Sequence, residues 1–144
     1  MSSIDPKPEI QRSLTEFQMK IAYKSKLLVD GPYFPYQKFR DNSREIESCP
    51  NSDSPGVYLF CSGEGNFLYI GECLGKLGNR VWAHIGKSGE ANDPYPNAKS
   101  WIKESKPDIA IYTIALPEDH WFLAPALEKY LIKTLKPENN ILDR

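Results

Sequence analysis

The sequence predicts a mixed α/β (α+β) fold in which helices accompany three short β-strands. Two segments, one near each end of the 144 residues, carry apolar side chains at the 3.6-residue spacing of an amphipathic helix. Between them lie three short runs typical of β-strands, and a four-residue, glycine-bearing gap between the first two predicts a hairpin. A chain of this length has room for one domain of ordinary size.

The first predicted helix spans residues 9–29. Its apolar side chains are Ile10, Leu14, Phe17, Ile21 and Leu28. Asp30-Gly31-Pro32 ends the helix, at the start of an aromatic connector that is rich in proline. Because the residues that follow are polar and turn-rich, we expect 1–54 to be an N-terminal helical extension packed on a core formed by 55–144.

The core begins with the predicted hairpin, whose strands are residues 56–61 and 66–72. Asn79 is a residue type that caps helices, and it starts a predicted helix that ends near residue 87. A short helix at 98–105 and a third strand at 108–116 follow.

The last predicted helix spans residues 119–135 and is the most apolar helix of the chain. Four leucines recur along it at intervals of four residues, which places them on one face. Pro125 lies inside this segment, so either the helix begins there or its first turn is irregular.

Composition and charge limit the classes of protein that are possible. With 40% hydrophobic and 26% charged residues, the chain is typical of a globular protein. Its 18 Lys and Arg against 19 Asp and Glu exclude a nucleic-acid binder that is basic throughout, but not one with a local basic face. No apolar run approaches the roughly 18 residues of a membrane helix, and the first residues lack the pattern of a signal peptide. We therefore expect a cytoplasmic protein with no membrane partner.

A set of polar residues carries the functional signal of the sequence. Two tyrosines lie on the paired strands, an Arg and a His share one helix face at i and i+4, and a Glu and an Asn lie in and after the last helix. The residues are Tyr58, Tyr69, Arg80, His84, Glu128 and Asn140. Each alone is common in ordinary strands, solvated helix faces or turns, so the order and spacing of the whole set decide its meaning.

That order resembles the GIY-YIG nuclease family. Gly56-Val57-Tyr58 stands in place of GIY, and Tyr69-Ile70-Gly71 matches YIG, its tyrosine eleven residues after Tyr58. Arg80 follows eleven residues after Tyr69, Glu128 lies on the late helix, and residues 136–142 resemble the closing segment of the family. The resemblance covers about 55–142 and implies a small three-stranded antiparallel sheet flanked by helices, with metal-dependent cleavage of phosphodiester bonds.

The resemblance also implies roles for these residues. The guanidinium of Arg80 suits a phosphate, and the carboxylate of Glu128 suits Mg²⁺ or Mn²⁺. The resemblance points to Tyr58 as the base, although a phenol with a pKa near 10 needs cationic neighbours for that role. His84 titrates closer to neutrality. We favour Tyr58 as base with help from His84 over His84 alone, with Tyr69 orienting water or phosphate.

Asn140 is expected to hold the end of the last helix and, with it, Glu128. Two features depart from the family pattern. Glu72 directly follows the YIG triplet, where it could repel the substrate phosphate or help to hold metal, and Pro125 makes the entry to the last helix unusual. Neither departure removes a residue from the candidate set.

A local excess of positive charge is the expected nucleic-acid face. Within residues 74–103, four lysines accompany Arg80, with only two acids in the same stretch. They are Lys76, Lys87, Lys99 and Lys103. The first helix carries a second basic excess. Because phosphate contacts supply most of the affinity for nucleic acid, we expect these cations to bind DNA, with RNA as the less favoured partner.

The sequence therefore predicts a metal-dependent DNA endonuclease, with a restriction-type enzyme favoured by the small size of the chain. Cleavage of both strands with one active site per chain would require a homodimer or sequential nicking. Two alternatives keep the fold without the activity, namely a non-cleaving nucleic-acid-binding module and a scaffold for protein interaction.

Overall fold

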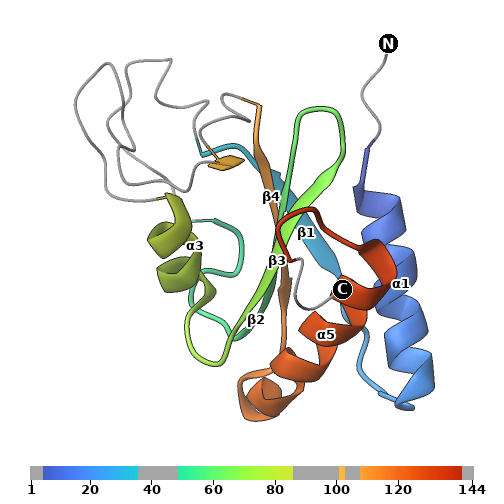
Figure 1. Cartoon of the computed structure of the whole chain (residues 1–144). Coiled ribbons are helices and arrows are strands. Elements are labelled where there is room, and N and C mark those ends of the chain that lie inside the picture. The colour runs from blue at the N-terminus through green and yellow to red at the C-terminus, as the bar shows by residue number, and fades with distance from the viewer. Residues whose placement is uncertain (1–4, 36–48, 86–100, 103–107, 141–144) are drawn as a thin grey trace.

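The computed structural model describes residues 5–35, 49–85, 101–102 and 108–140. A four-stranded antiparallel sheet lies between two helical layers, with α1 and α5 against one face and α3 against the other (Figure 1). In chain order the elements are α1 (Lys7–Lys20), β1 (Val29–Tyr33), β2 (Gly56–Cys61), β3 (Phe67–Cys73), α3 (Leu77–Ile85), β4 (Ala110–Ala115), the 3₁₀ helix η1 (Glu118–Leu123) and α5 (Ala124–Leu135). The mixed α/β class is confirmed.

The strands are ordered β1-β4-β2-β3, and each neighbouring pair is antiparallel. The expected hairpin is confirmed as β2 and β3, with Tyr58 opposite Gly71. On its other side β2 pairs with β4, so every residue of β2 is buried. The sheet has four strands rather than the expected three, because β1 adds an edge strand beside β4.

The expected helix over 9–29 is wrong after Lys20. Ile21 and Leu28, which fitted the helical spacing, are 42% and 54% exposed, whereas Leu27 and Val29 are buried. The chain therefore changes to the two-residue alternation of a strand. Gly31-Pro32 looked like a terminator, but β1 is an edge strand whose register shifts at these residues, so the missing proline N–H is tolerated there.

The last helix resolves the choice posed by Pro125. Residues 118–123 form η1, and α5 begins at Ala124 with the proline in its first turn, where no backbone N–H is needed. α3 begins at Leu77, two residues before the expected cap Asn79. Of the short helix expected at 98–105, only residues 101–102 are described, and they are helical.

The apolar core has one part on each side of the sheet. One part lies between the sheet and the helices α1 and α5, and the other lies under α3. Ile10, Leu14 and Phe17 of α1 pack in the first part together with leucines of α5. The described part of the N-terminal segment thus contributes both a strand and core side chains.

The outer edge of β3 is covered by the chain that follows α5. Lys136 adopts a left-handed conformation with φ +52° and ends the helix. The backbone N–H groups of Glu138 and Asn139 then donate to the carbonyls of Phe67 and Leu68 at 3.0 and 2.9 Å. This contact satisfies part of an exposed edge and brings Asn140 against β3.

Candidate active site

Tyr58 is the centre of the candidate site. It lies on the α3 side of the sheet with 1% of its surface exposed, and its ring extends over Gly71 on the neighbouring strand. A Cβ atom at residue 71 would overlap the end of the Tyr58 ring, so only glycine leaves space for it. Gly56 has a φ of +155°, and a Cβ there would overlap the carbonyl of Ile114. Both glycines of the GVY and YIG triplets are therefore required by the packing.

His84 and Arg80 reach Tyr58 from α3. The hydroxyl of Tyr58 and Nε2 of His84 are 2.8 Å apart. Buried Leu77, Val81 and Ile85 hold the opposite side of the helix against the sheet. The i, i+4 spacing of Arg80 and His84 then brings both toward the tyrosine, as the sequence predicted.

Charge and burial around Tyr58 have opposing effects on its pKa. Burial raises the pKa of the phenol, and the neighbouring Tyr69 and the carboxylate of Glu128 raise it too. The guanidinium of Arg80 lowers the pKa through its charge and a side-chain hydrogen bond, but the net direction is upward. A tyrosinate base needs cationic neighbours that lower its pKa, and here the effect of Arg80 is smaller than the combined effects of burial, Tyr69 and Glu128.

These interactions show that the candidate residues converge. Tyr69 of β3 and both Arg80 and His84 of α3 contact Tyr58. Glu128 of α5 raises the pKa of Tyr58 through its negative charge. Glu128 is half-buried on α5, beside the leucines that face the sheet.

Asn140 supports the site from the outer edge of β3, the strand that carries the YIG triplet. It is 8% exposed, its amide Oδ1 accepts from the backbone N–H of Ile70, and its Nδ2 donates to the carbonyl of the same residue, both at 2.9 Å. Ile70 lies between Tyr69 and Gly71. The amide thus fixes β3 at the YIG triplet and contacts the strand rather than the end of the helix.

The donor chemistry of the site fits a hydrated Mg²⁺ ion. Among the described residues there is no group of three or more His, Cys, Asp and Glu side chains arranged to hold a metal. Mg²⁺ commonly takes only one or two protein carboxylates and completes its shell with water and substrate phosphate oxygens. Glu128, whose charge raises the pKa of Tyr58, is the candidate carboxylate for this role.

Glu72 lies on the face of β3 opposite to Tyr58, which is the face against which α5 packs. Side chains alternate along a strand, and Gly71 is the residue that faces Tyr58. One carboxylate oxygen of Glu72 is buried, with no hydrogen-bond partner among the described residues. A buried acceptor without a partner is costly, so this departure from the family pattern has a stability cost of its own.

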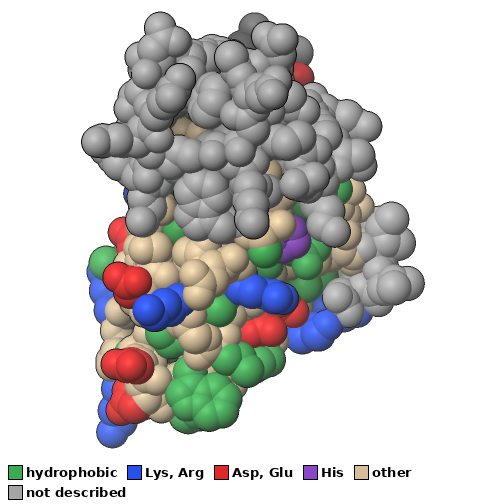
Figure 2. Space-filling view, turned by 90° about the vertical axis from the view of Figure 1, so that its left-hand side faces the viewer, with side chains coloured by type: hydrophobic (Ala, Val, Ile, Leu, Met, Phe, Trp, Pro, Cys, Tyr) green, Lys and Arg blue, Asp and Glu red, His purple; other side chains and the backbone are tan. Residues whose placement is uncertain are grey.

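The expected basic face is described only in part. Lys76 and Arg80 are exposed at α3 and the loop before it, whereas Lys87, Lys99 and Lys103 lie outside the described residues. Figure 2 shows Lys or Arg, Asp or Glu and His side chains close together on the side of the molecule that carries α3. The basic excess of α1 lies in the layer on the opposite face of the sheet (Figure 1).

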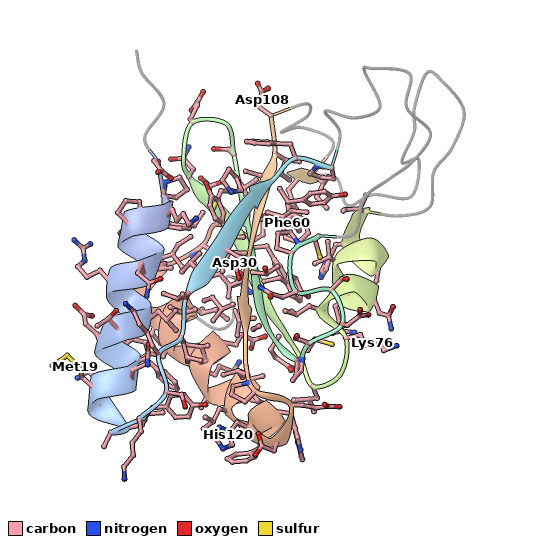
Figure 3. The ribbon with its side chains drawn as sticks, turned by 180° about the vertical axis from the view of Figure 1, so that it is seen from behind. Met19, Asp30, Phe60, Lys76, Asp108 and His120 are labelled. Atoms are coloured by element: carbon pink, nitrogen blue, oxygen red, sulfur yellow. The ribbon has the colours of Figure 1, made fainter. Side chains whose placement is uncertain are left out.

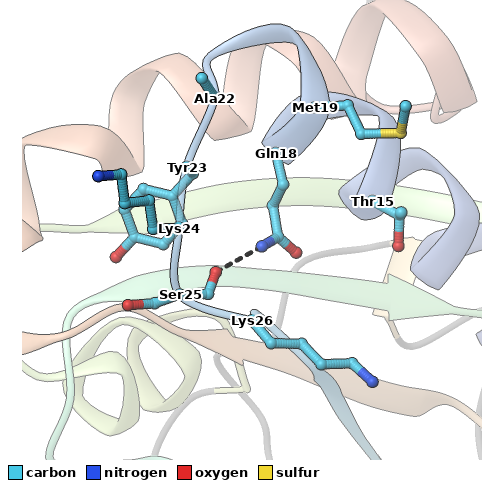
Figure 4. A pocket seen from close by; sticks show the side chains of 8 residues that line it. All are labelled: Thr15, Gln18, Met19, Ala22, Tyr23, Lys24, Ser25 and Lys26. Carbon is cyan, nitrogen blue, oxygen red and sulfur yellow. Dashed lines mark hydrogen bonds between the residues drawn. The ribbon is translucent and has the colours of Figure 1, made fainter.

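A separate pocket lies at the end of α1. Its volume is about 460 Å³, and it is lined by eight residues of α1 and the following connector, among them Gln18 and Lys24 (Figure 4). No candidate site residue lines it. Nearby, the hydroxyl of Tyr23 lies 2.6 Å from Nδ1 of His120 in η1, at the end of the molecule labelled in Figure 3.

No helix among the described residues is long and apolar enough to cross a membrane.

The sheet, the glycine-dependent tyrosine and the cluster around it define a nuclease domain. The chain belongs to the GIY-YIG family, because a model of the GIY-YIG catalytic domain matches residues 54–141. Members of this class are phosphodiester hydrolases, and the resemblance inferred from the sequence is confirmed.

Curated relatives of the chain include UvrABC system protein C of several bacteria. The protein of Nautilia profundicola is 35% identical over 104 residues, which cover 71% of this chain and 16% of the relative. That of Koribacter versatilis is 33% identical over 104 residues, 72% of this chain and 15% of the relative. The protein of Chlamydia trachomatis serovar D is 31% identical over 91 residues, which cover 63% of this chain and 14% of the relative. The chain thus spans a small part of these relatives. No solved structure matches it significantly.

One aromatic residue that contacts the site was not among the site residues predicted from the sequence. Trp101 stacks on Tyr69, with ring centroids 5.5 Å apart and planes 20° apart. It also contacts Phe60 edge-on at 5.3 Å. In the sequence Trp101 lies between α3 and β4, and no regular spacing of residues there indicates that its side chain reaches the site.

Proposed function

We propose that this protein is a Mg²⁺-dependent endonuclease that hydrolyses phosphodiester bonds in DNA. The observation that carries the proposal is the convergence of Tyr69, Arg80, His84 and Glu128 on the buried Tyr58. Membership of the GIY-YIG family supports the reaction class, and the similarity to UvrABC system protein C supports DNA as the substrate.

Hydrolysis of a phosphodiester requires a water nucleophile that loses a proton and stabilisation of the charge that develops on phosphate. Arg80 is exposed and its guanidinium can bind two phosphate oxygens, while it also lies beside Tyr58. Glu128 would hold the metal ion. When bound, Mg²⁺ supplies Lewis-acid stabilisation of phosphate and the leaving oxygen.

For the proton we propose a relay rather than a free tyrosinate. The hydroxyl of Tyr58 donates to Nε2 of His84 and passes its proton there as it accepts the proton of the attacking water. The phenol is never left as an anion, which agrees with the upward shift of its pKa. His84 then carries the positive charge and returns the proton to solvent. Tyr69 orients the water or the phosphate.

The test is a nicking assay with supercoiled plasmid DNA, in Mg²⁺ and in EDTA. We expect nicked and linear products only with the metal, and a loss of about 100-fold or more for Arg80→Ala and Glu128→Gln. Glu9→Gln is the matched control for Glu128→Gln, because Glu9 is exposed on α1 and is not a candidate site residue. This control variant should keep the wild-type rate within about twofold.

The outcomes separate the competing functions. Tight binding of DNA without cleavage in any metal would instead support a non-cleaving binding module. Cleavage that is equal in EDTA, or unaffected by the Arg80 and Glu128 substitutions, would overturn the proposed mechanism. Restriction-type cleavage stays a prediction, and discrete fragments from linear DNA are the result it requires. Size-exclusion chromatography with light scattering tests the expected homodimer.

A further inference from the structure

Trp101 is positioned to support two residues of the proposed active site at once. Trp101 and its neighbour Ile102 are both helical, and Ile102 is fully buried in the core under α3. From this anchor the indole stacks on Tyr69 at 5.5 Å, and its centroid lies 6.2 Å from that of His84. Tyr69 and His84 also contact each other, with centroids 4.8 Å apart.

The planes of the Tyr69 and His84 rings depend on the side chains packed against them. The last side-chain torsion of Tyr and His has broad minima, so rotamer preference alone does not fix the plane of either ring. Tyr58 is held by almost complete burial and by the tight fit over Gly71, whereas Tyr69 and His84 are only half-buried. The anchored indole is stacked on Tyr69 and tilted by 49° against His84, so it restricts both rings. Tyr58 and Phe60 contact His84 from other directions.

The plane of His84 matters because it sets the proton path. Nε2 must point at the Tyr58 hydroxyl for the 2.8 Å contact to exist, and a rotation of the imidazole would break that hydrogen bond. We propose that Trp101 is a positioning residue, which holds the rings of Tyr69 and His84 in the orientation that permits proton transfer from Tyr58 to His84. The proposal rests on the proposed nuclease function for its kinetic consequence, but not for its structural one.

The kinetic test compares variants that differ in shape but not in polarity. Trp101→Leu keeps an apolar filling and removes the flat face, and it should lower kcat by about 10- to 100-fold with KM for plasmid DNA changed by less than about twofold. Trp101→Phe restores an aromatic face and should recover most of kcat. Trp121→Leu is the matched control, since Trp121 is 47% exposed on η1, and it should leave both constants unchanged. Thermal unfolding verifies that each variant is folded.

A second readout does not depend on cleavage. The chain contains only two histidines, so the ring nitrogens of His84 and His120 can be assigned by NMR with a His120→Gln variant. In the wild type we expect His84 as one tautomer, with Nε2 as the acceptor for Tyr58. Trp101→Leu should move His84 toward an average of the two tautomers, and Trp101→Phe should not.

The two readouts separate failure of this inference from failure of the proposed function. A wild-type protein that never cleaves DNA contradicts the function, while the tautomer of His84 still tests the role of Trp101. Unchanged tautomer and kcat in a folded Trp101→Leu protein would overturn the positioning role. A parallel loss of kcat in Trp101→Leu and Trp101→Phe would do so as well, because a generic packing defect would then explain the effect.

Discussion

At the scale of single residues, the site depends on a phenol that the protein keeps neutral. Tyr58 is almost completely buried, and its hydroxyl contacts His84 while Arg80 and Glu128 act on it with opposite charge. Burial decides the balance, because transfer of an anion out of water costs more than one partly solvated cation returns. A hydroxyl in this state is suited to pass a proton between two partners rather than to hold a charge.

Gly71 is the residue on which the position of Tyr58 depends. We expect Gly71→Ala to destabilise the fold by about 1–3 kcal/mol and to abolish cleavage, because the new Cβ would overlap the tyrosine ring. Gly75→Ala is the matched control, since a Cβ there meets nothing within 4 Å. Urea unfolding and the nicking assay measure the two effects. Equal stability of the two variants would contradict the packing described for Tyr58.

The raised pKa of Tyr58 predicts how stability depends on pH. The group is neutral when protonated, and its folded-state pKa lies above the unfolded value near 10. Its contribution to the free energy of unfolding is therefore complete below about pH 10 and is lost as pH rises above that value. Burial also raises the pKa of Cys61 from 9.0 to about 12, so the contribution of Cys61 to the free energy of unfolding begins to fall near pH 9.

We expect the free energy of unfolding to fall between about pH 9 and 12, and to fall less steeply in Tyr58→Phe. The difference in slope should be at most about 1.4 kcal/mol per pH unit, which corresponds to one proton. Urea titrations followed by circular dichroism at a series of pH values give both slopes. Identical slopes in the two proteins would show that Tyr58 ionises in the folded state as readily as in the unfolded state.

At the scale of elements, the edge strand β3 is held by the chain that follows α5. Asn140→Ala would leave both the N–H and the carbonyl of buried Ile70 without their partners, at an expected cost of about 1–3 kcal/mol. Asn139→Ala is the natural comparison, because its Nδ2 also donates to β3, at Leu68, but the residue is exposed. Thermal unfolding should show that Asn140→Ala is clearly the less stable variant. A reversed ranking would contradict a stabilising role for the two hydrogen bonds between Asn140 and Ile70.

The same contrast between elements explains what the sequence could predict. β2 and β3 are predictable because their β-type residues flank a glycine-bearing turn, and α5 because its leucines recur every four residues. β1 is not predictable, since Gly31-Pro32 within it is typical of a terminator and only pairing with β4 makes it a strand. η1 was predicted only as the start of the last helix, with Pro125 marking either the true start or an irregular first turn; none of its residues is buried, so packing gave no signal of its separate 3₁₀ conformation.

The order and spacing of the motif residues in the sequence were enough to predict which residues form the site. The surroundings of each side chain in the folded protein could not be predicted in this way. The five spaced elements of the motif could be recognised without coordinates, and Tyr58, Arg80 and His84 lie together as expected. The direction of the Tyr58 pKa shift could not be foreseen, since it depends on how deeply the ring is buried. Trp101 is joined to Tyr69 only by tertiary packing, to which no spacing in the sequence corresponds.

At the scale of the whole molecule, the N-terminal segment is part of the fold on which the catalytic domain is built. The family match begins at residue 54, yet β1 pairs with β4 inside the match, and Ile10, Leu14 and Phe17 of α1 pack in the core that α1 shares with the sheet and α5. Gln11 ties these two elements together, because its Oε1 accepts from the N–H of Val29 at 2.9 Å. Removal of this segment would expose β4 as an edge and uncover apolar side chains of α5.

We therefore expect a chain that begins at residue 49 to lose cooperative unfolding, although it retains all the candidate site residues. Three large side chains of α1 are lost from the core, each of which contributes about 1.5–3 kcal/mol by burial, and this total is comparable to the 5–15 kcal/mol stability of an ordinary domain. Differential scanning calorimetry of the truncated and full chains measures the effect. The double variant Arg12→Ala and Glu9→Gln, which alters only exposed residues of α1, should unfold as the wild type does. A truncated chain that unfolds cooperatively near the wild-type temperature, and cleaves DNA, would show instead that 55–144 is an independent nuclease domain and that α1 and β1 merely pack on it.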